Sequence, residues 1–224
     1  MDKAMWDKLA AAGGIVAVVL IVVGILVVGQ PPEISDDAAS VADFFQDNRD
    51  QVLWGTFLQG LGVLAIIWFI AALGVAMRNA GEGRLAAAMG IAFAITFSVG
   101  AVAALLRAAL AYSVADEAAD PSVVLALYHS AAAMDTLSSL IGAGIYAAVA
   151  GAVIRTGLLH TWWGWLSGVA ALWSVVSATA WGRDGFWSPD GAEFISFIVF
   201  LAWVLVTSIL LTMKGRTSTS VSMA

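Results

Sequence analysis

Six apolar segments dominate the sequence, and each is long enough to cross a lipid bilayer as a helix. They lie near residues 9–29, 52–77, 85–112, 122–154, 162–181 and 191–213, and a spanning helix needs roughly 20 apolar residues. Hydrophobic residues make up 61% of the 224 residues and charged residues only 12%, about half the charge of an ordinary soluble domain. The sequence therefore predicts an all-α, polytopic membrane protein built as a six-transmembrane-helix bundle.

The basic residues between these segments predict the orientation. Six spans place most of them on one side of the bilayer: Lys3, Lys8, Arg78, Arg84, Arg155, Lys214 and Arg216. Arg49 and Arg183 fall on the other side, and Arg107 stays within a span. Because cytoplasmic loops carry the excess of Lys and Arg, both termini are expected in the cytoplasm. We expect one membrane domain over residues 1–213 and a disordered, Ser- and Thr-rich cytoplasmic tail over 214–224.

The outer side carries the one sizeable loop, and this loop predicts a short helix. Pro31 and Pro32 end the first span, and an apolar edge follows at helical spacing in Val41, Phe44 and Phe45. Residues 36–48 are therefore expected to form an interfacial helix with its acidic residues in water. Ser40 is the expected cap of this helix, with Asp43 as its partner.

The composition argues against several classes of function. The chain has no Cys and two His residues, which lie on opposite sides of the predicted membrane, so we expect no metal site and no cofactor. No metalloprotease, nucleophile-elbow or P-loop motif occurs. A net charge of −6 without a basic patch argues against nucleic acid. The sequence therefore favours a protein that is not an enzyme.

Two ionised side chains stand well inside the spans, Arg107 in the third and Asp135 in the fourth. If the two helices mirror each other about Pro121, Arg107 lies opposite Asp135. The same mirror pairs Ala103 with Ser139, Gly100 with Gly142 and Thr96 with Tyr146. Because a cation buried in hydrocarbon needs a partner, we predict an ion pair between Arg107 and Asp135.

Four polar residues fall at a similar height near the outer rim of the membrane. Counting roughly 20 residues from the cytoplasmic Arg or Lys of each span gives Gln59, Arg107, Asp135 and Glu193. Two interpretations of this outer polar ring stay open. It is either a structural clamp between helices or an entry site for an ion or small solute.

Further residues would line a cavity if the ring led inward. Thr96, Ser139, Gly142 and Tyr146 share the inward faces of the third and fourth spans. Trp68, Trp173 and Trp203 are expected near mid-membrane, where each indole N–H needs a partner. These tryptophans either line a pocket for an apolar ligand or pack as core aromatics between helices. A path for protons or ions requires polar access below Asp135, past Gly142 and Tyr146.

Two stretches carry a resemblance to a known family. One runs from Ser40 to Gly55, and the other is the Arg155-Thr-Gly turn followed by Trp162-Trp163-Gly164-Trp165. In these stretches the chain resembles small six-helix membrane proteins of actinobacteria, grouped loosely with domain-of-unknown-function family 4386. The resemblance implies a bacterial cytoplasmic (inner) membrane protein and transfers no catalytic residue.

The sequence thus leads to one main hypothesis and one alternative. The main hypothesis is a non-enzymatic integral membrane protein of unassigned role, with the lipid bilayer as its surroundings. It would act as an accessory component that contacts another membrane subunit, or as a component that binds a small ligand. The alternative is a channel or transporter entered through the outer polar ring.

Overall fold

Helices make up most of the part of the chain that the structure describes. The computed structural model describes residues 3–115 and 120–220, with side chains for 9–115 and 120–214. The elements in order are α1 (Lys3–Val28), α2 (Ala38–Asp47), α3 (Arg49–Asn79), α4 (Gly83–Ala109), the π-helix η1 (Leu110–Val114), α5 (Pro121–Thr156), α6 (Thr161–Ser177), the π-helix η2 (Pro189–Glu193) and α7 (Phe194–Ser220). No strand occurs in these ranges. The predicted all-α fold is confirmed.

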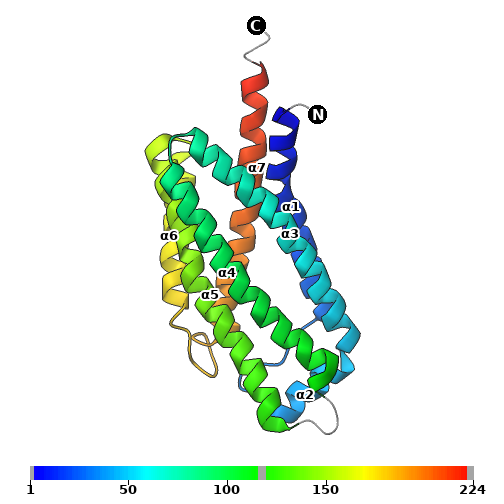
Figure 1. Ribbon diagram of the computed structural model, residues 1–224. Coiled ribbons are helices and arrows are strands. Elements are labelled where there is room, and N and C mark those ends of the chain that lie inside the picture. Colours follow the sequence, from blue (N-terminus) through cyan, green and yellow to red (C-terminus); the bar gives the residue numbers. More distant parts are fainter. Residues whose placement is uncertain (1–2, 116–119, 221–224) are drawn as a thin grey trace.

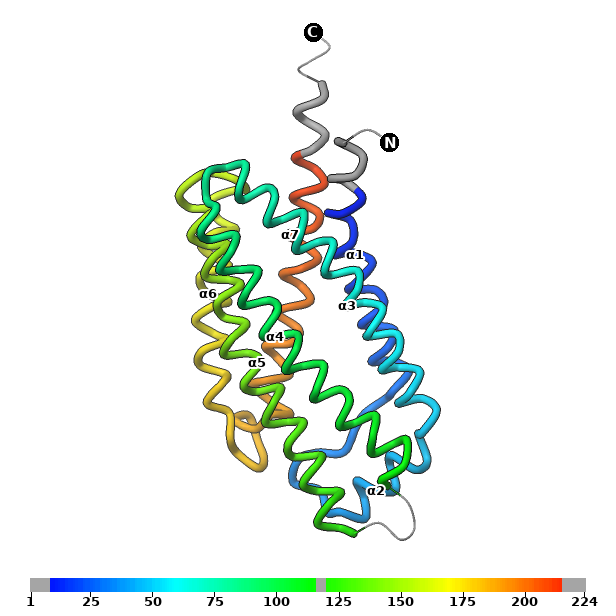
Figure 2. Tube along the Cα trace, viewed as in Figure 1, coloured from blue at the N-terminus to red at the C-terminus, as the bar shows by residue number. Residues whose placement is uncertain are grey.

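The long helices lie side by side along one axis, with both termini at the same end of the molecule (Figure 1). Helix α1 packs along α3 and α7, whereas α5 packs along α4 and α6. The trace in Figure 2 shows α7 between the α1–α3 pair and the α4–α5–α6 group. Helix α2 is short and lies at the opposite end from the termini, which we call the outer end.

Within the part of the chain that the structure describes, five segments are long and apolar enough to cross a membrane: Leu9–Val28, Arg49–Asn79, Gly83–Val114, Pro121–Thr156 and Pro189–Lys214. The fifth predicted span, 162–181, corresponds to α6, which has 17 residues and is not among these five segments. Helix α7 continues to Ser220, so the tail predicted to be disordered from residue 214 is helical over most of its length. Residues 221–224 of that tail lie outside the described residues.

Glycine allows α1 and α3 to approach until their backbones touch. A Cβ atom on Gly24 would lie 2.8 Å from the carbonyl oxygen of Gly55, and one on Gly13 would lie 2.8 Å from that of Ala65. Such approach lets membrane helices gain van der Waals contact where the lipid supplies no hydrophobic driving force between them. The α1–α3 pair is therefore a tightly packed unit.

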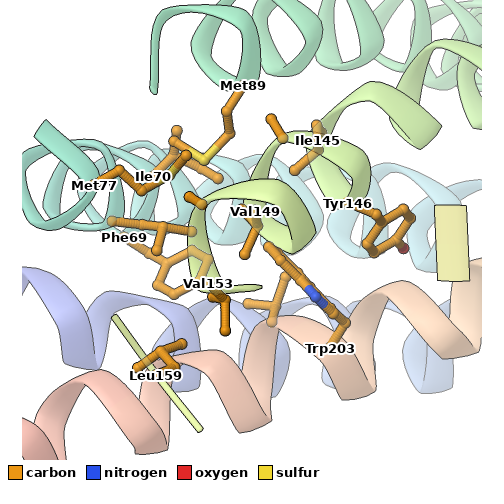
Figure 3. Close-up of a cluster of buried hydrophobic side chains, with 14 of the residues drawn as sticks. Phe69, Ile70, Met77, Met89, Ile145, Tyr146, Val149, Val153, Leu159 and Trp203 are labelled. Carbon is orange, nitrogen blue, oxygen red and sulfur yellow. The ribbon is translucent and has the colours of Figure 1, made fainter. Parts of the chain in front are cut away.

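The core at the inner, terminal side is apolar and aromatic (Figure 3). Phe69 of α3 and Trp203 of α7 meet edge to face with ring centroids 6.4 Å apart, and Tyr146 of α5 meets Trp203 in the same way at 5.2 Å. These three side chains are at most 3% exposed. Edge-to-face aromatic pairs add roughly 1 kcal/mol each beyond their buried area. This cluster joins the α1–α3 pair to α5 through α7.

The outer end is closed by α2. Val41 and Phe45 of α2 are buried against Leu110, Val124 and Tyr128 from η1 and α5. The predicted interfacial helix over 36–48 thus corresponds to Ala38–Asp47.

The cap of α2 differs from the predicted one. Asp37 is the N-cap, and its carboxylate accepts from the backbone N–H of Ser40 at 2.8 Å. The Ser40 prediction was wrong because Asp37, three residues earlier, supplies the same kind of acceptor at the position where the backbone is still extended.

Candidate functional site

An ion pair joins α4 and α5 near the outer end of the bundle. Nη2 of Arg107 lies 2.5 Å from Oδ2 of Asp135, and the two side chains are 34% and 31% exposed. Arg107 stands in the last turn of α4, one turn before the π-helix η1. The arginine therefore lies at the C-terminal end of an α-helix, where a positive charge is favoured by the helix dipole.

The backbone register of the α4–α5 hairpin differs from the predicted mirror about Pro121. Gly142 faces Thr96, and Gly144 faces Ala92, whereas the mirror placed Gly142 opposite Gly100. Side chains in a helix lean toward its N-terminus, in opposite directions on two antiparallel helices. The long Arg107 side chain can therefore reach Asp135 although its own Cα lies farther toward the outer end. Small residues set the backbone register, and the predicted partners for them were wrong by about one helical turn.

A second polar contact lies one turn below the ion pair. The hydroxyl of Ser139, four residues after Asp135 on α5, donates to Oε1 of Glu193. Glu193 is the last residue of η2 and is only 9% exposed. Its other oxygen, Oε2, is buried without a hydrogen-bond partner in the described part of the chain. Three of the four predicted ring residues, Arg107, Asp135 and Glu193, thus gather around one face of α5; we call them, with Ser139, the outer polar cluster.

The fourth predicted ring residue, Gln59, lies elsewhere. Its side chain packs against Gly24 of α1, where a Cβ atom would meet Cγ of Gln59 at 2.9 Å. Among the described residues no hydrogen bond joins Gln59 to the outer polar cluster. The sequence prediction rested on depth along the helix, and depth does not specify which face of the helix meets which neighbour. Gln59 belongs to the α1–α3 contact.

The predicted cavity-lining residues of α4 and α5 lead into packed protein. Gly142 and Tyr146 are buried, and Thr96 lies against Gly142. The hydroxyl of Thr96 is buried without a hydrogen-bond partner among the described residues. Below this level Tyr146 meets Trp203, so the polar face of α5 ends at the aromatic cluster of Figure 3.

The three tryptophans predicted near mid-membrane have three different surroundings. Trp203 is 2% exposed and donates its indole N–H to the hydroxyl of Ser167 at 2.9 Å. Trp173 packs against Phe186 with centroids 6.3 Å apart, and its buried indole N–H has no partner in the described residues. Trp68 is 62% exposed on the outside of α3, so its assignment to a cavity was wrong. The outward face of a helix, whose residues recur every three to four positions, is left for lipid, and a Trp is apolar enough to lie there.

An outer strap, residues 29–37, crosses from α1 to the outer ends of α5 and η2. The Tyr128 hydroxyl donates to the carbonyl of Pro32, and the Ile34 N–H donates to Oδ2 of Asp190 at 2.8 Å. A ring nitrogen of His129 lies 3.2 Å from the carbonyl of Ile34. Sequence reasoning missed this strap. Two features of the sequence could have indicated it. Pro31 and Pro32 leave backbone carbonyls without a helical partner. Tyr128 lies seven residues before Asp135, which puts both side chains on one helix face.

The exposed caps of two helices carry the clearest electrostatic shifts outside the spans. Hydrogen bonds from the backbone and side chain of Ser40 lower the pKa of Asp37. The side chain and backbone of Ser122 do the same for the pKa of Asp120, the N-cap of α5. Both carboxylates are thus held in their charged form at helix N-termini, where negative charge is favoured.

Within the described residues, neither a metal cluster nor the open hollow at the α2–α3 corner coincides with the outer polar cluster. In residues 9–115 and 120–214, whose side chains the structure describes, no group of three or more His, Cys, Asp or Glu side chains is placed to hold a metal ion. An open hollow of about 780 Å³ lies at the α2–α3 corner, between Asp47, Arg49 and Trp54.

The sequence matches the family described as Domain of unknown function (DUF4386) over residues 9–216. This match covers nearly the whole chain, so the protein belongs to that family. No curated protein and no solved structure matches the chain. The family membership predicted from the Ser40–Gly55 and Arg155–Gly168 stretches is confirmed.

Proposed function

We propose that this DUF4386 protein is a non-enzymatic inner-membrane protein in which the outer polar cluster acts as a structural clamp. The observation that carries the proposal is the end of polarity along α5. Below Ser139 the inward face continues through Gly142 and Tyr146 into the buried aromatic cluster around Trp203. A solute that entered at the outer end would meet packed side chains there.

The proposed topology has six crossings with both termini in the cytoplasm of a bacterium. Helix α6 would be the crossing that brings the five long segments to six. It lies along α5 and is followed by further apolar residues up to Trp181. At 1.5 Å per residue its helical part is about 26 Å long, close to the hydrocarbon thickness of about 30 Å. Trp162 and Trp165 at its start and Trp181 beyond its end are exposed, as expected for anchors at the two interfaces.

The contacts of the outer polar cluster support the clamp. Arg107–Asp135 links α4 to α5, and Ser139–Glu193 links α5 to the segment that begins α7. Tyr128 on the same helix holds the outer strap. One helix, α5, therefore fixes the outer ends of three other segments. A bundle fixed in this way would serve as an accessory subunit that presents its lipid-facing helices to another membrane protein.

The experiment uses the absence of native Cys. Single Cys residues are placed at Ser139, Gly142 and Tyr146 and labelled from outside with a membrane-impermeant thiol reagent. The proposal predicts labelling at Ser139 at most, and none at Gly142 or Tyr146 until the protein is unfolded. Asp43→Cys, on the exposed side of α2, is the positive control. Labelling at Gly142 and Tyr146 in the folded protein would contradict the clamp.

A second candidate, a channel or transporter, has one observation in its favour. Oε2 of Glu193 and the Thr96 hydroxyl are buried without partners in the described residues, at neighbouring levels of α5. Buried polar groups of this kind require an explanation, and an ion or ordered water is one. The transport candidate predicts that labelling proceeds past Gly142 and is slowed by the transported solute.

A further inference from the structure

The outer polar cluster has one more negative charge than its cations neutralise. It contains two carboxylates, Asp135 and Glu193, and one guanidinium, Arg107. Arg107 is bound to Asp135, whereas the Glu193 carboxylate has one hydrogen bond within the described residues, and it comes from the uncharged Ser139. An ionised carboxylate buried without a counter-charge is strongly unfavourable, so such a group binds a cation or takes up a proton.

The local structure of Glu193 points to the same conclusion independently. Glu193 is 9% exposed, and its Oε2 is buried without a hydrogen-bond partner among the described residues. It is the final residue of the π-helix η2, immediately before α7 begins. Short π-helical turns occur frequently at functional sites because they place a side chain where a regular helix would not. In transporters, too, interrupted helices supply the groups that bind ions.

The charged and titratable groups around Glu193 are engaged elsewhere. On α5, Asp135 is paired with Arg107 of α4, and Tyr146 packs on Trp203. On η2 itself, Asp190 accepts from the Ile34 N–H of the outer strap. Toward α6 the neighbours are hydroxyls: Ser196, three residues after Glu193, donates to Ser177 at 2.6 Å. Among the residues whose side chains are described, these contacts leave Glu193 without a cation of its own.

We propose that Glu193, supported by Ser139, is a binding site for a small monovalent cation, either a proton or Na⁺, taken up from the outer side. A proton would bond to Oε2 and leave Oε1 to accept from Ser139. A sodium ion would be coordinated by Oε2 directly. Either ligand neutralises the unmatched charge of the outer polar cluster. The site goes beyond the clamp and does not require transport, because a structural protein can bind a cation at one end only.

The test measures the unfolding temperature of the purified full chain in detergent, for the unchanged protein and for Glu193→Gln. Glutamine has the shape of a neutral glutamate and needs no cation. If the ligand is a proton, the unchanged protein should lose a few degrees of stability as pH rises from about 5 to about 8, because ionising Glu193 is costly in the folded state. If the ligand is Na⁺, Na⁺ but not K⁺ should restore those degrees at about pH 8, in a saturable manner.

Glu193→Gln should remove the pH response in the first case and the Na⁺ response in the second. Glu33→Gln, on the exposed outer strap, is the matched control and should leave both responses unchanged. Equal responses in the unchanged protein and in Glu193→Gln would overturn the site.

Should Glu193→Gln fail to fold, Ser139→Ala takes its place. It should move the pH response to higher pH or raise the Na⁺ concentration needed for half the effect, and an unaltered response would equally overturn the site. The thiol-labelling result is independent of these outcomes.

Discussion

The outer and inner parts of this bundle are held together by different kinds of interaction. At the outer end, single polar contacts tie segments to α5: the Arg107–Asp135 pair, the Ser139–Glu193 hydrogen bond and the Tyr128–Pro32 hydrogen bond. At the inner end, many apolar contacts around Trp203 hold the helices together. The polar contacts are directional and depend on pairing, whereas the apolar cluster depends on volume and shape. Substitutions should therefore act in different ways in the two parts.

The largest effect is expected in the apolar part, from Trp203→Ala. Trp203 is 2% exposed and contacts Phe69, Tyr146 and Ser167. Removing it leaves a cavity and takes away the hydrogen bond that the Ser167 hydroxyl accepts, so the free energy of unfolding should fall by about 4 kcal/mol. Unfolding in mixed detergent micelles measures this loss. Trp68→Ala, 62% exposed on the lipid side, is the matched control and should cost far less. Similar losses for the two tryptophans would mean that the cluster is not tightly packed.

The α1–α3 contact should respond to added volume. In Gly24→Ala the new methyl group would lie 2.8 Å from the carbonyl oxygen of Gly55, so the helices must separate, at a cost of about 2 kcal/mol. Gly60 lies on α3, the partner helix, and a Cβ atom there would have no atom within 4 Å. Gly60→Ala should therefore be neutral or slightly stabilising. The same unfolding assay compares them, and a stable Gly24→Ala protein would show that the close approach is dispensable.

A smaller effect is expected at the outer strap. Tyr128→Phe removes the hydrogen bond to the Pro32 carbonyl but keeps the ring packed against Phe45, with centroids 5.9 Å apart. The free energy of unfolding should fall by about 1 kcal/mol. Proteolysis of residues 29–37 from the outer side should accelerate more than global unfolding does. Unchanged proteolysis would mean that the aromatic packing alone holds the strap.

The smallest effect belongs to the cap of α2 and depends on pH. Because the pKa of Asp37 is lowered below 3.8 by its hydrogen bonds with Ser40, its charged form stabilises the folded state above that pH. The contribution disappears as pH falls through the lowered value. Asp37→Ala should therefore be slightly less stable than the unchanged protein at neutral pH. The difference should vanish in acid, and a difference that persists there would point to packing instead.

The sequence predicted the helices well because the period and length of apolar segments depend on local chemistry. The predicted spans 52–77 and 122–154 agree with α3 and α5 to within a few residues. The contacts between helices were harder to predict. Arg107 and Asp135 do meet, but the backbone register of their helices is shifted by about one turn. Gln59 packs against Gly24 of α1 instead of joining the outer polar cluster, because counting residues along a helix does not tell which of its faces meets which neighbour.

The outer strap could not be predicted for a related reason. Its backbone groups find partners in distant parts of the chain, such as the Ile34 N–H with the carboxylate of Asp190. No local pattern specifies such a pair. Trp68 illustrates the converse case: a large aromatic at mid-membrane depth was expected inside, but an apolar solvent makes its exposure acceptable.

The most direct test of the clamp is a double-mutant cycle on Arg107 and Asp135. Each single substitution to Ala leaves a charge without its partner and should lower the free energy of unfolding by about 3 kcal/mol, the low end for buried pairs because a third of each side chain is exposed. The double substitution should recover much of that loss. Arg49→Ala, which breaks an exposed pair with Asp50, controls for loss of charge and should cost under about 1 kcal/mol. A double variant that loses the sum of the two single effects would show that the residues act independently, and the clamp would be contradicted.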